Sequence, residues 1–263
     1  MKRAVIVGAG VGGLTAAIAL RAIGWEVSIF ERWPQINAEG TALGLRPDAH
    51  AGLAALGLGE RLRERTVPYR RARIRTPRGR HLADLPLGRI EGRGGAPVRM
   101  LSRVALIEML LEEVDRSTIS TGVEPAGVRE TLDDLRAHYA GWHDPIPRLL
   151  AAADDDSVLR HEVYDAPPLT SYVTANVALV GDAAHAMTPA LGQGACQALL
   201  DAIELAACLR EHPGDVAPAL RAYDARRRPA AQRIVTVSRW MTRLAGSARL
   251  AGPRDALMRL LPV

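Results

Sequence analysis

The chain opens with a short apolar run, a glycine-rich loop and a longer helical pattern, in that order. The apolar run covers 3–7, the loop covers 8–13, and the helical run 14–23 ends at Gly24. A second short apolar run, 26–30, ends at Glu31. Runs this short are typical of buried strands, whereas the intervening run has the length of a helix. The pattern predicts a βαβ unit with two parallel strands.

The loop of this unit has the spacing of a nucleotide-binding turn. Gly8, Gly10 and Gly13 form a GxGxxG pattern, and Glu31 follows 18 residues after the last glycine. Such glycines allow a tight turn, a close approach to a pyrophosphate, and close helix–strand packing. The helix start attracts phosphate, and Glu31 is placed to accept ribose hydroxyls. We predict a dinucleotide site, which the motif alone assigns to neither NAD nor FAD. The alternative is that the glycines only permit a tight turn.

A second block repeats the order of strand, loop and helix. The apolar run 177–181 predicts a buried strand, and the loop 182–189 follows it. Gly192 and Gly194 then open a helix that runs through Leu209. Asp182 stands at the carboxyl end of the predicted strand, which is where α/β sheets bind ligands.

Two further helices are expected between these blocks. The first covers 49–56, with Pro47 in its first turn and glycines at its end. The second covers 104–114, with Ser102 as its N-cap.

Composition narrows the class of protein. Apolar residues make up 48% and charged residues 24%, which argues against a mainly disordered chain. The net charge of +5 permits an anionic ligand without requiring one. Four Trp, five Tyr and one Phe are few for a protein that stacks on single-stranded nucleic acid. Two Cys residues are too few for a disulfide framework, and no metal-type Cys/His cluster occurs in the sequence.

The N-terminal residues resemble a secretory signal only superficially. Lys2 and Arg3 precede an apolar stretch, but four glycines interrupt it and no small-residue cleavage site follows. No other stretch approaches the roughly 18 apolar residues that a spanning helix needs. We expect a cytoplasmic protein with reduced thiols and no membrane partner.

Several motifs resemble the FAD-dependent aromatic hydroxylases of the para-hydroxybenzoate hydroxylase type, the group A flavoprotein monooxygenases. They are VGAGVGGL with Glu31-Arg32, GTALGLRPDA, Arg103 with its helix, VALVGDAAHAMTPALGQGACQALLDA and YDARRRP. The resemblance covers about 1–114 and 130–260. It implies an α/β fold: a Rossmann-type FAD-binding domain from two chain segments, a reduced or incompletely represented substrate-binding region, and C-terminal helices.

The resemblance also implies roles for individual residues. Asp182 would bind the ribityl chain, Arg103 the ribityl or pyrophosphate region, and Pro189 would lie near the flavin face where oxygen reacts. The helix opened by Gly192 and Gly194 would direct its positive end at the flavin pyrimidine edge. Cys196 stands where the family often has Asn, so one side-chain hydrogen bond is expected to be missing. The implied cofactor-binding residues are Gly8, Gly10, Val11, Gly12, Gly13, Glu31, Arg32, Arg103, Asp182, Pro189, Gly192, Gly194 and Ala195.

The implied activity is hydroxylation of a small aromatic substrate. In the family, NAD(P)H reduces FAD, O2 adds at the flavin C4a position, and the resulting hydroperoxide transfers the hydroxyl group. NAD(P)H is expected only as a transient co-substrate, because the sequence has one dinucleotide fingerprint. No catalytic acid or base is assigned. Two alternatives stay open: a flavin-binding protein without hydroxylase activity, such as an auxiliary or regulatory subunit, and an NAD-dependent dehydrogenase.

Other charged residues have structural alternatives. We expect His185 to order its loop rather than act as a base, and Asp182 could instead cap a helix. The segment 61–80 has nine Arg against one acid. Because 73–75 alternates like a strand, a solvated surface is favoured over a nucleic-acid site. Residues 226–228 are expected to form an exposed helix face, whose arginines can pair with acidic side chains of the same chain.

A departure from the family is expected near 115–122. The family has a strand pair, an Asp-Gly fingerprint and most of a substrate-binding sheet there, on the order of 100 residues. Either the deletion is real or residues are omitted from this sequence. We favour omission, which predicts a Cα step well above 3.8 Å within 114–123 and an intact mass above 28.3 kDa. The expected domains are 1–114, a substrate-region remnant 115–175, and 176–263.

Overall fold

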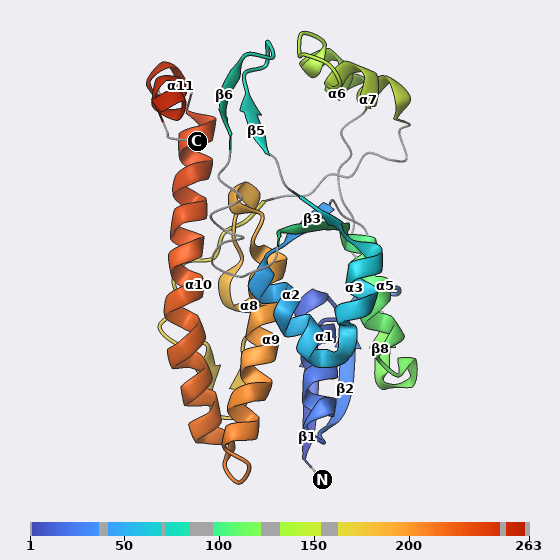
Figure 1. Cartoon of the computed structure of the whole chain (residues 1–263). Coiled ribbons are helices and arrows are strands. Elements are labelled where there is room, and N and C mark those ends of the chain that lie inside the picture. The colour runs from blue at the N-terminus through green and yellow to red at the C-terminus, as the bar shows by residue number, and fades with distance from the viewer. Residues whose placement is uncertain are drawn as a thin grey trace.

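The computed structural model describes residues 2–36, 42–69, 72–84, 97–121, 132–153, 163–247 and 251–260. Figure 1 shows a lower body, which holds both glycine-rich segments, and a group of short elements above it. In the described ranges, no helix is both long and apolar enough to cross a membrane.

The central sheet of the lower body is parallel, with the strand order β1-β2-β8. The strands are β1 (Arg3–Val7), β2 (Glu26–Glu31) and β8 (Ile119–Thr121). Helix α1 (Val11–Ala22) connects β1 to β2 and starts three residues before the predicted run. The register pairs Val7 with Phe30. The predicted βαβ unit is therefore confirmed.

The described elements cover only one face of this sheet. A Cβ added to Gly13 of α1 would lie 3.3 Å from Ile6, so α1 packs on the Ile6 face. On the opposite face Val5, Val7 and Phe30 are 68%, 88% and 49% exposed. Parallel sheets are normally buried on both faces. The prediction of a buried strand over 3–7 is thus wrong for this face, which we call the open face.

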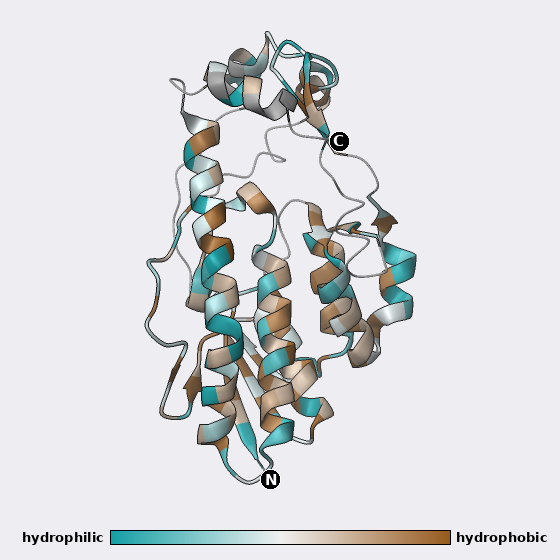
Figure 2. Ribbon diagram, turned by 60° about the vertical axis from the view of Figure 1, so that its left-hand side comes forward, coloured by the Kyte–Doolittle hydropathy of each residue, from teal (hydrophilic) through white to brown (hydrophobic). Residues whose placement is uncertain are grey.

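Two long helices carry the second glycine-rich segment. Helices α9 (Gly194–Glu211) and α10 (Val216–Gly246) pack side by side (Figure 1). Apolar and polar stretches alternate along α10 (Figure 2), as expected for a helix with one buried face. The predicted helix from Gly194 through Leu209 is confirmed.

The strand predicted over 177–181 is shorter than expected. Strand β10 (Val177–Ala178) pairs antiparallel with β9 (Val173–Thr174), and Val177 is exposed. Among the described residues it does not join the sheet of β1, because an apolar cavity of about 600 Å³ separates β1 from 176–180. A strand needs a neighbour for its N–H and C=O groups, and only a short hairpin supplies one here. The prediction of a buried strand is corrected accordingly.

A second sheet is antiparallel and has the order β3-β7-β4. It contains β3 (Ala42–Leu45), β7 (Arg99–Ser102) and β4 (Val67–Pro68). Helix α5 (Arg103–Glu112) follows β7, and the Ser102 hydroxyl accepts the N–H of Ala105 at 3.0 Å. The predicted N-cap is confirmed.

The helix expected over 49–56 is confirmed, with a kink at its predicted end. Helix α2 (Pro47–Leu53) is followed by η1 (Ala54–Leu58) and α3 (Gly59–Arg65). Gly57, at φ 88°, has non-helical geometry and separates two helical segments. A single left-handed glycine allows such a kink while the following residues resume helical geometry.

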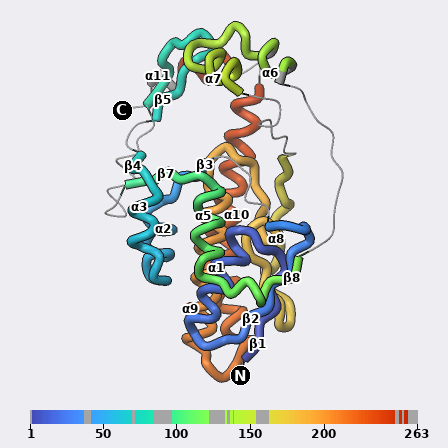
Figure 3. The backbone as a smooth tube through the Cα atoms, turned by 90° about the vertical axis from the view of Figure 1, so that its right-hand side faces the viewer, coloured from blue at the N-terminus to red at the C-terminus, as the bar shows by residue number. Residues whose placement is uncertain are grey.

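The upper group combines segments from distant parts of the chain (Figures 1 and 3). It contains β5 (Arg73–Arg75), β6 (His81–Asp84), α6 (Leu132–Tyr139), α7 (Ile146–Ala152) and α11 (Ala251–Leu260). The strand predicted at 73–75 is confirmed as half of a hairpin. The N–H of His143 donates to the carbonyl of Pro77 at 2.9 Å and ties the α6–α7 segment to this hairpin.

The structure describes the segment around the expected gap as far as Thr121. The N–H of Val114 donates to Leu111, that of Thr118 to Asp115, and β8 pairs with β2. Gly122 and Val123 lie outside the described residues, and the long Cα step expected within 114–123 stays a prediction. Because β8 belongs to the central sheet, part of the expected remnant 115–175 lies in the lower body. The domain boundaries stay a prediction.

Candidate functional site

Two adjoining cavities open where the glycine-rich segments end. Each has a volume of about 560 Å³. All thirteen residues predicted to bind a cofactor line one or both. Both cavities are lined by Gly8, Gly10, Arg103 and Asp182. The first, here the loop cavity, adds Val11, Gly12, Gly13, Pro189, Gly192, Gly194 and Ala195. The second, here the Glu31 cavity, adds Glu31 and Arg32.

The turn from β1 into α1 requires glycine for two different reasons. Gly8 has φ 102°, a region that L side chains rarely adopt, and its N–H donates to the carbonyl of Phe30 at 2.7 Å. A Cβ on Gly13 would lie 1.9 Å from the carbonyl oxygen of Gly8. A Cβ on Gly10 would meet no atom within 4 Å and would project into open space beside the cavities. The structure thus separates glycines that shape the turn from one that leaves room for a ligand.

Glu31 turns its carboxylate toward this turn. Oε2 accepts the N–H of Ala9 at 2.6 Å, and Oε1 accepts the N–H of Trp33 at 3.1 Å. The side chain therefore lies at the wall of the Glu31 cavity and not out in solvent. The guanidinium of Arg32 lies 5.3 Å from the centre of the Trp33 ring, within cation–π range.

Two helix N-termini border the cavities. Helix α1 starts at Val11 and α9 starts at Gly194, and both of these residues line the loop cavity. The first N–H groups of a helix lack intrahelical partners and carry partial positive charge. Neither of these two fully described helices has an acid in its first turn. The cavities are therefore suited to a ligand with negative charge.

The loop after β10 contributes the acid of the site. It contains a short helix, α8 (Asp182–His185), and a 3₁₀ turn, η4 (Pro189–Leu191). Asp182 is exposed and lines both cavities. The alternative that Asp182 caps a helix is wrong, because Gly181 is the cap residue of α8 and no side chain makes the capping hydrogen bond.

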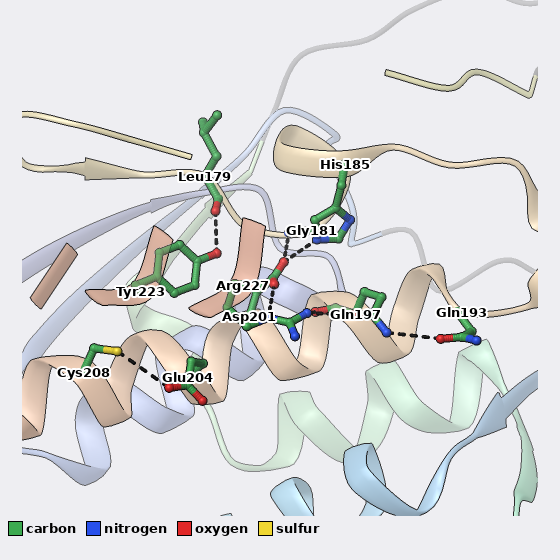
Figure 4. A network of polar contacts seen from close by, with 10 residues as sticks. All are labelled: Leu179, Gly181, His185, Gln193, Gln197, Asp201, Glu204, Cys208, Tyr223 and Arg227. Carbon is green, nitrogen blue, oxygen red and sulfur yellow. Dashed lines mark hydrogen bonds and ion pairs between the residues drawn. The ribbon is translucent and has the colours of Figure 1, made fainter. Parts of the chain in front are cut away.

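A buried network lies directly beneath this loop (Figure 4). The carboxylate of Asp201 accepts the N–H of Gly181 at 3.0 Å and the Nε of Arg227 at 2.7 Å. Nε2 of His185 lies 2.5 Å from Oδ2 of Asp201. His185 is buried and does not line either cavity. It therefore orders the loop, as expected, and is not placed to act as a base.

The family assignment follows from the sequence of the whole chain. A family model described as FAD binding domain matches residues 2–144 and 159–238, most of the chain. The chain belongs to this FAD binding domain family. The resemblance to FAD-dependent hydroxylases is confirmed at this level, and the fold of the flavoprotein is the α/β fold that the resemblance implies.

Proteins with sequences similar to this flavoprotein include a hydroxylase and a monooxygenase. The FAD-dependent urate hydroxylase of Klebsiella pneumoniae is 26% identical, covering 86% of this chain and 85% of the relative. The 3-amino-4-hydroxybenzoate 2-monooxygenase of Streptomyces cremeus is 28% identical, covering 98% and 91%. The crystal structure of Klebsiella pneumoniae HpxO with FAD and uric acid superposes with a TM-score of 0.87 at 24% identity, covering 98% and 93%. At that identity, the superposition establishes a shared fold.

The relatives are longer than this flavoprotein. The two sequence alignments span 329 and 365 positions, against the 263 residues of the chain. Each relative therefore contains stretches that have no counterpart here. This supports the expectation that the chain has less polypeptide than its family, and the place near 115–122 stays a prediction.

Sequence reasoning missed the buried ion pair of Arg227 and Asp201, which organises the site. Arg227 was expected on an exposed face, but it is 9% exposed and pairs with Asp201. The two neighbouring arginines form ion pairs with acids of the same chain, as expected. Arg226 pairs with Glu204 and Glu211, and Arg228 pairs with Asp224. The sequence did contain a signal for this pair. Asp201 is a charged residue among apolar neighbours in a helix, and a buried charge requires a partner of opposite charge.

Cys196 has a replacement for the hydrogen bond expected to be missing. Its thiol donates to the carbonyl of Gly44 in β3 at 3.2 Å. Burial raises the pKa of this thiol, so that it stays protonated and a donor at neutral pH. The contact links the first turn of α9 to β3, and Gly44 also lines the loop cavity.

Proposed function

We propose that the chain is an FAD-dependent monooxygenase that uses NAD(P)H and O2 to hydroxylate a small aromatic or heterocyclic substrate. In the net reaction, one oxygen atom enters the substrate and the other leaves as water, with two electrons from NAD(P)H. The observation that carries the proposal is the convergence of thirteen predicted residues on two adjoining cavities beside two helix N-termini.

The residues around the cavities fit FAD. Glu31 would accept the adenosine ribose hydroxyls, and the N-terminus of α1 would hold the pyrophosphate. Arg103, at the first position of α5 and on both cavity walls, would add a positive charge near the phosphates or ribityl chain. Asp182 would accept hydrogen bonds from the ribityl hydroxyls. Gly10 and Gly192 leave space for the ligand, because a Cβ on either would meet no protein atom within 4 Å.

When bound, FAD supplies the redox and oxygen chemistry, which no amino-acid side chain provides. The chain's own contribution is position and electrostatics. The N-terminus of α9 would stabilise negative charge on the reduced ring system. Thr188 and Pro189 line the same cavity and would restrict the space beside that ring.

The partner that this site favours is a small molecule. Urate and 3-amino-4-hydroxybenzoate, on which the two relatives are named as acting, are the first compounds to test as substrates. We propose a cytoplasmic location because Cys196 and Cys208 are both free, buried thiols.

The test begins with the purified protein. We expect bound FAD, visible as a yellow absorbance spectrum and released on denaturation. We also expect NADH or NADPH oxidation that an aromatic or heterocyclic compound accelerates, with a hydroxylated product in the mass spectrum. A protein that neither retains nor rebinds FAD would overturn the proposal.

A flavin-binding protein without hydroxylase activity is the second candidate. The open face of the central sheet and the longer relatives favour it, because both indicate less polypeptide around the cofactor. A reactive oxygen species formed in an open site decays in water before it reaches a substrate. Stoichiometric hydrogen peroxide in place of hydroxylated product would support this candidate.

A further inference from the structure

We propose that Asp201, through His185 and Arg227, is a positioning residue that holds the Gly181–Asp182 turn and the start of α9 in the geometry that binds FAD. The inference rests on the proposed function and concerns residues that line neither cavity.

The first step is the position of the turn. Gly181 has φ 62°, and a Cβ there would lie 3.0 Å from the Cβ of Ala198. Its carbonyl accepts the N–H groups of Ala184 and His185, both at 2.9 Å. Its own N–H donates to Asp201, the only acceptor it has among the described residues. Asp182 follows directly in the chain, so a shift of this turn displaces the acid that borders both cavities.

The second step is the charge of Asp201. The residue is fully buried, and three donors surround its carboxylate: the Gly181 N–H, His185 and Arg227. A buried carboxylate is stable only when it is paired and hydrogen-bonded in this way. Removing its charge leaves the buried guanidinium of Arg227 without its ion-pair partner. The turn therefore depends on an ionised Asp201, not only on the volume of the side chain.

The third step connects this carboxylate to the other side of the loop cavity. Arg227 also donates to Oε1 of Gln197 at 2.7 Å, and Nε2 of Gln197 donates to Oε1 of Gln193 at 3.2 Å. Gln193 is the N-cap residue of α9, between the cavity-lining Gly192 and Gly194. One network thus reaches both the Asp182 turn and the helix start (Figure 4).

The experiment compares Asp201→Asn with a matched control. Asp224→Asn also removes a carboxylate that pairs with an arginine, Arg228, and accepts a backbone N–H, that of Tyr172 at 2.7 Å. Asp224 touches neither the Gly181 turn nor a cavity. For each protein we would measure the dissociation constants of FAD and of ADP, the visible circular dichroism of bound flavin, and the unfolding of the apoprotein.

We expect Asp201→Asn to weaken FAD at least tenfold and to change the flavin dichroism, while ADP binding stays within about twofold. ADP has neither the ribityl chain nor the ring system, so its binding does not depend on the contacts that Asp182 and the start of α9 would make with those parts of FAD. Asp224→Asn should lower apoprotein stability without either flavin effect. The inference is overturned if Asp201→Asn binds FAD within twofold of the unsubstituted protein, or if both variants lose FAD in proportion to stability. Failure of the unsubstituted protein to bind FAD refutes the proposed function instead.

A second pair keeps the inference testable if Asp201→Asn does not fold. His185→Ala removes one donor to Asp201, whereas His185→Gln retains an N–H at comparable reach. We expect His185→Ala to weaken FAD several-fold and His185→Gln to restore most of the affinity. Equal affinities for the two variants would contradict the positioning role.

Discussion

Asp182 is the acid whose removal tests the cofactor site most directly. Asp182→Ala should weaken FAD by about 1.5–3 kcal/mol, roughly ten- to a hundredfold, through the loss of a charge-assisted hydrogen bond. The measurement is the FAD dissociation constant from flavin fluorescence. Asp215→Ala is the control, because Asp215 accepts the N–H of Ala217 at the start of α10 and lies outside both cavities. Unchanged FAD affinity in Asp182→Ala would refute the assignment.

Two buried tyrosines should respond differently to loss of the hydroxyl group. Tyr223 donates to the carbonyl of Leu179 at 2.7 Å, whereas the Tyr172 hydroxyl has no hydrogen-bond partner among the described residues. Tyr223→Phe should lower the free energy of unfolding by about 1 kcal/mol. Tyr172→Phe should leave it unchanged or raise it, because an unpaired buried hydroxyl is costly. Urea unfolding of the two variants measures the difference, and equal losses would contradict it.

Ionisation of the same two tyrosines should lower the free energy of unfolding at alkaline pH. Burial, with a contribution from the charge of Asp201, raises the pKa of Tyr172 to about 12, and burial raises that of Tyr223 as well. The folded state therefore holds these protons more tightly than the unfolded chain, in which tyrosine has a pKa of about 10. This contribution is fully present below pH 10 and is lost as the pH rises from about 10 to about 12. Unfolding free energies over this range should fall less steeply in Tyr172→Phe.

At the scale of elements, the β1–α1 turn contains a matched pair of glycines. Gly13→Ala brings a Cβ to 1.9 Å from the Gly8 carbonyl oxygen, so the backbone must shift. We expect about 1–3 kcal/mol loss of apoprotein stability, as for other overpacked sites. Gly10→Ala meets no protein atom and should retain stability, but its Cβ occupies space that the pyrophosphate needs. Thermal unfolding of the apoprotein and FAD titration separate the two effects. Loss of stability in Gly10→Ala with normal FAD binding would contradict this division.

At the scale of the whole molecule, the open face predicts association. Val5 and Phe30 are exposed on a parallel sheet, next to the apolar cavity between β1 and 176–180. Exposed apolar patches and free strand edges bind hydrophobic dyes and other chains. The double variant Val5→Thr/Phe30→Thr should bind less anilinonaphthalene sulfonate and associate less in sedimentation. Both positions lie outside the two candidate cofactor cavities, so FAD binding should be retained.

Val237 in α10 provides the control for this prediction. It is also an exposed apolar residue, but it belongs to helix α10 and not to the central sheet. Val237→Thr should leave dye binding and association almost unchanged. If the double variant behaves like Val237→Thr, the open face is covered in the native protein. An intact mass above 28.3 kDa would then identify additional polypeptide as the cover.

Much of the candidate site was predictable because its requirements are local. Gly8 and Gly13 are fixed by a turn between neighbouring elements, and Asp182 by the Gly181 turn that starts α8. Spacing along the chain encodes such features directly. The helix end at Gly57 was predictable as well, but the second helix that starts directly after it was not.

The sequence by itself determined the βαβ unit and the family, since both depend on motifs within short segments, and the resemblance to that family indicated the thirteen residues that line the cavities. Only the tertiary structure decided that Arg227 is buried against Asp201, because those residues are 26 positions apart on different helices. Only it placed β10 in a hairpin outside the sheet of β1 and left Val5 and Val7 exposed. An apolar pattern indicates that a strand is stabilised when both of its faces are buried. Whether any polypeptide covers it depends on contacts between distant segments, which local patterns do not specify.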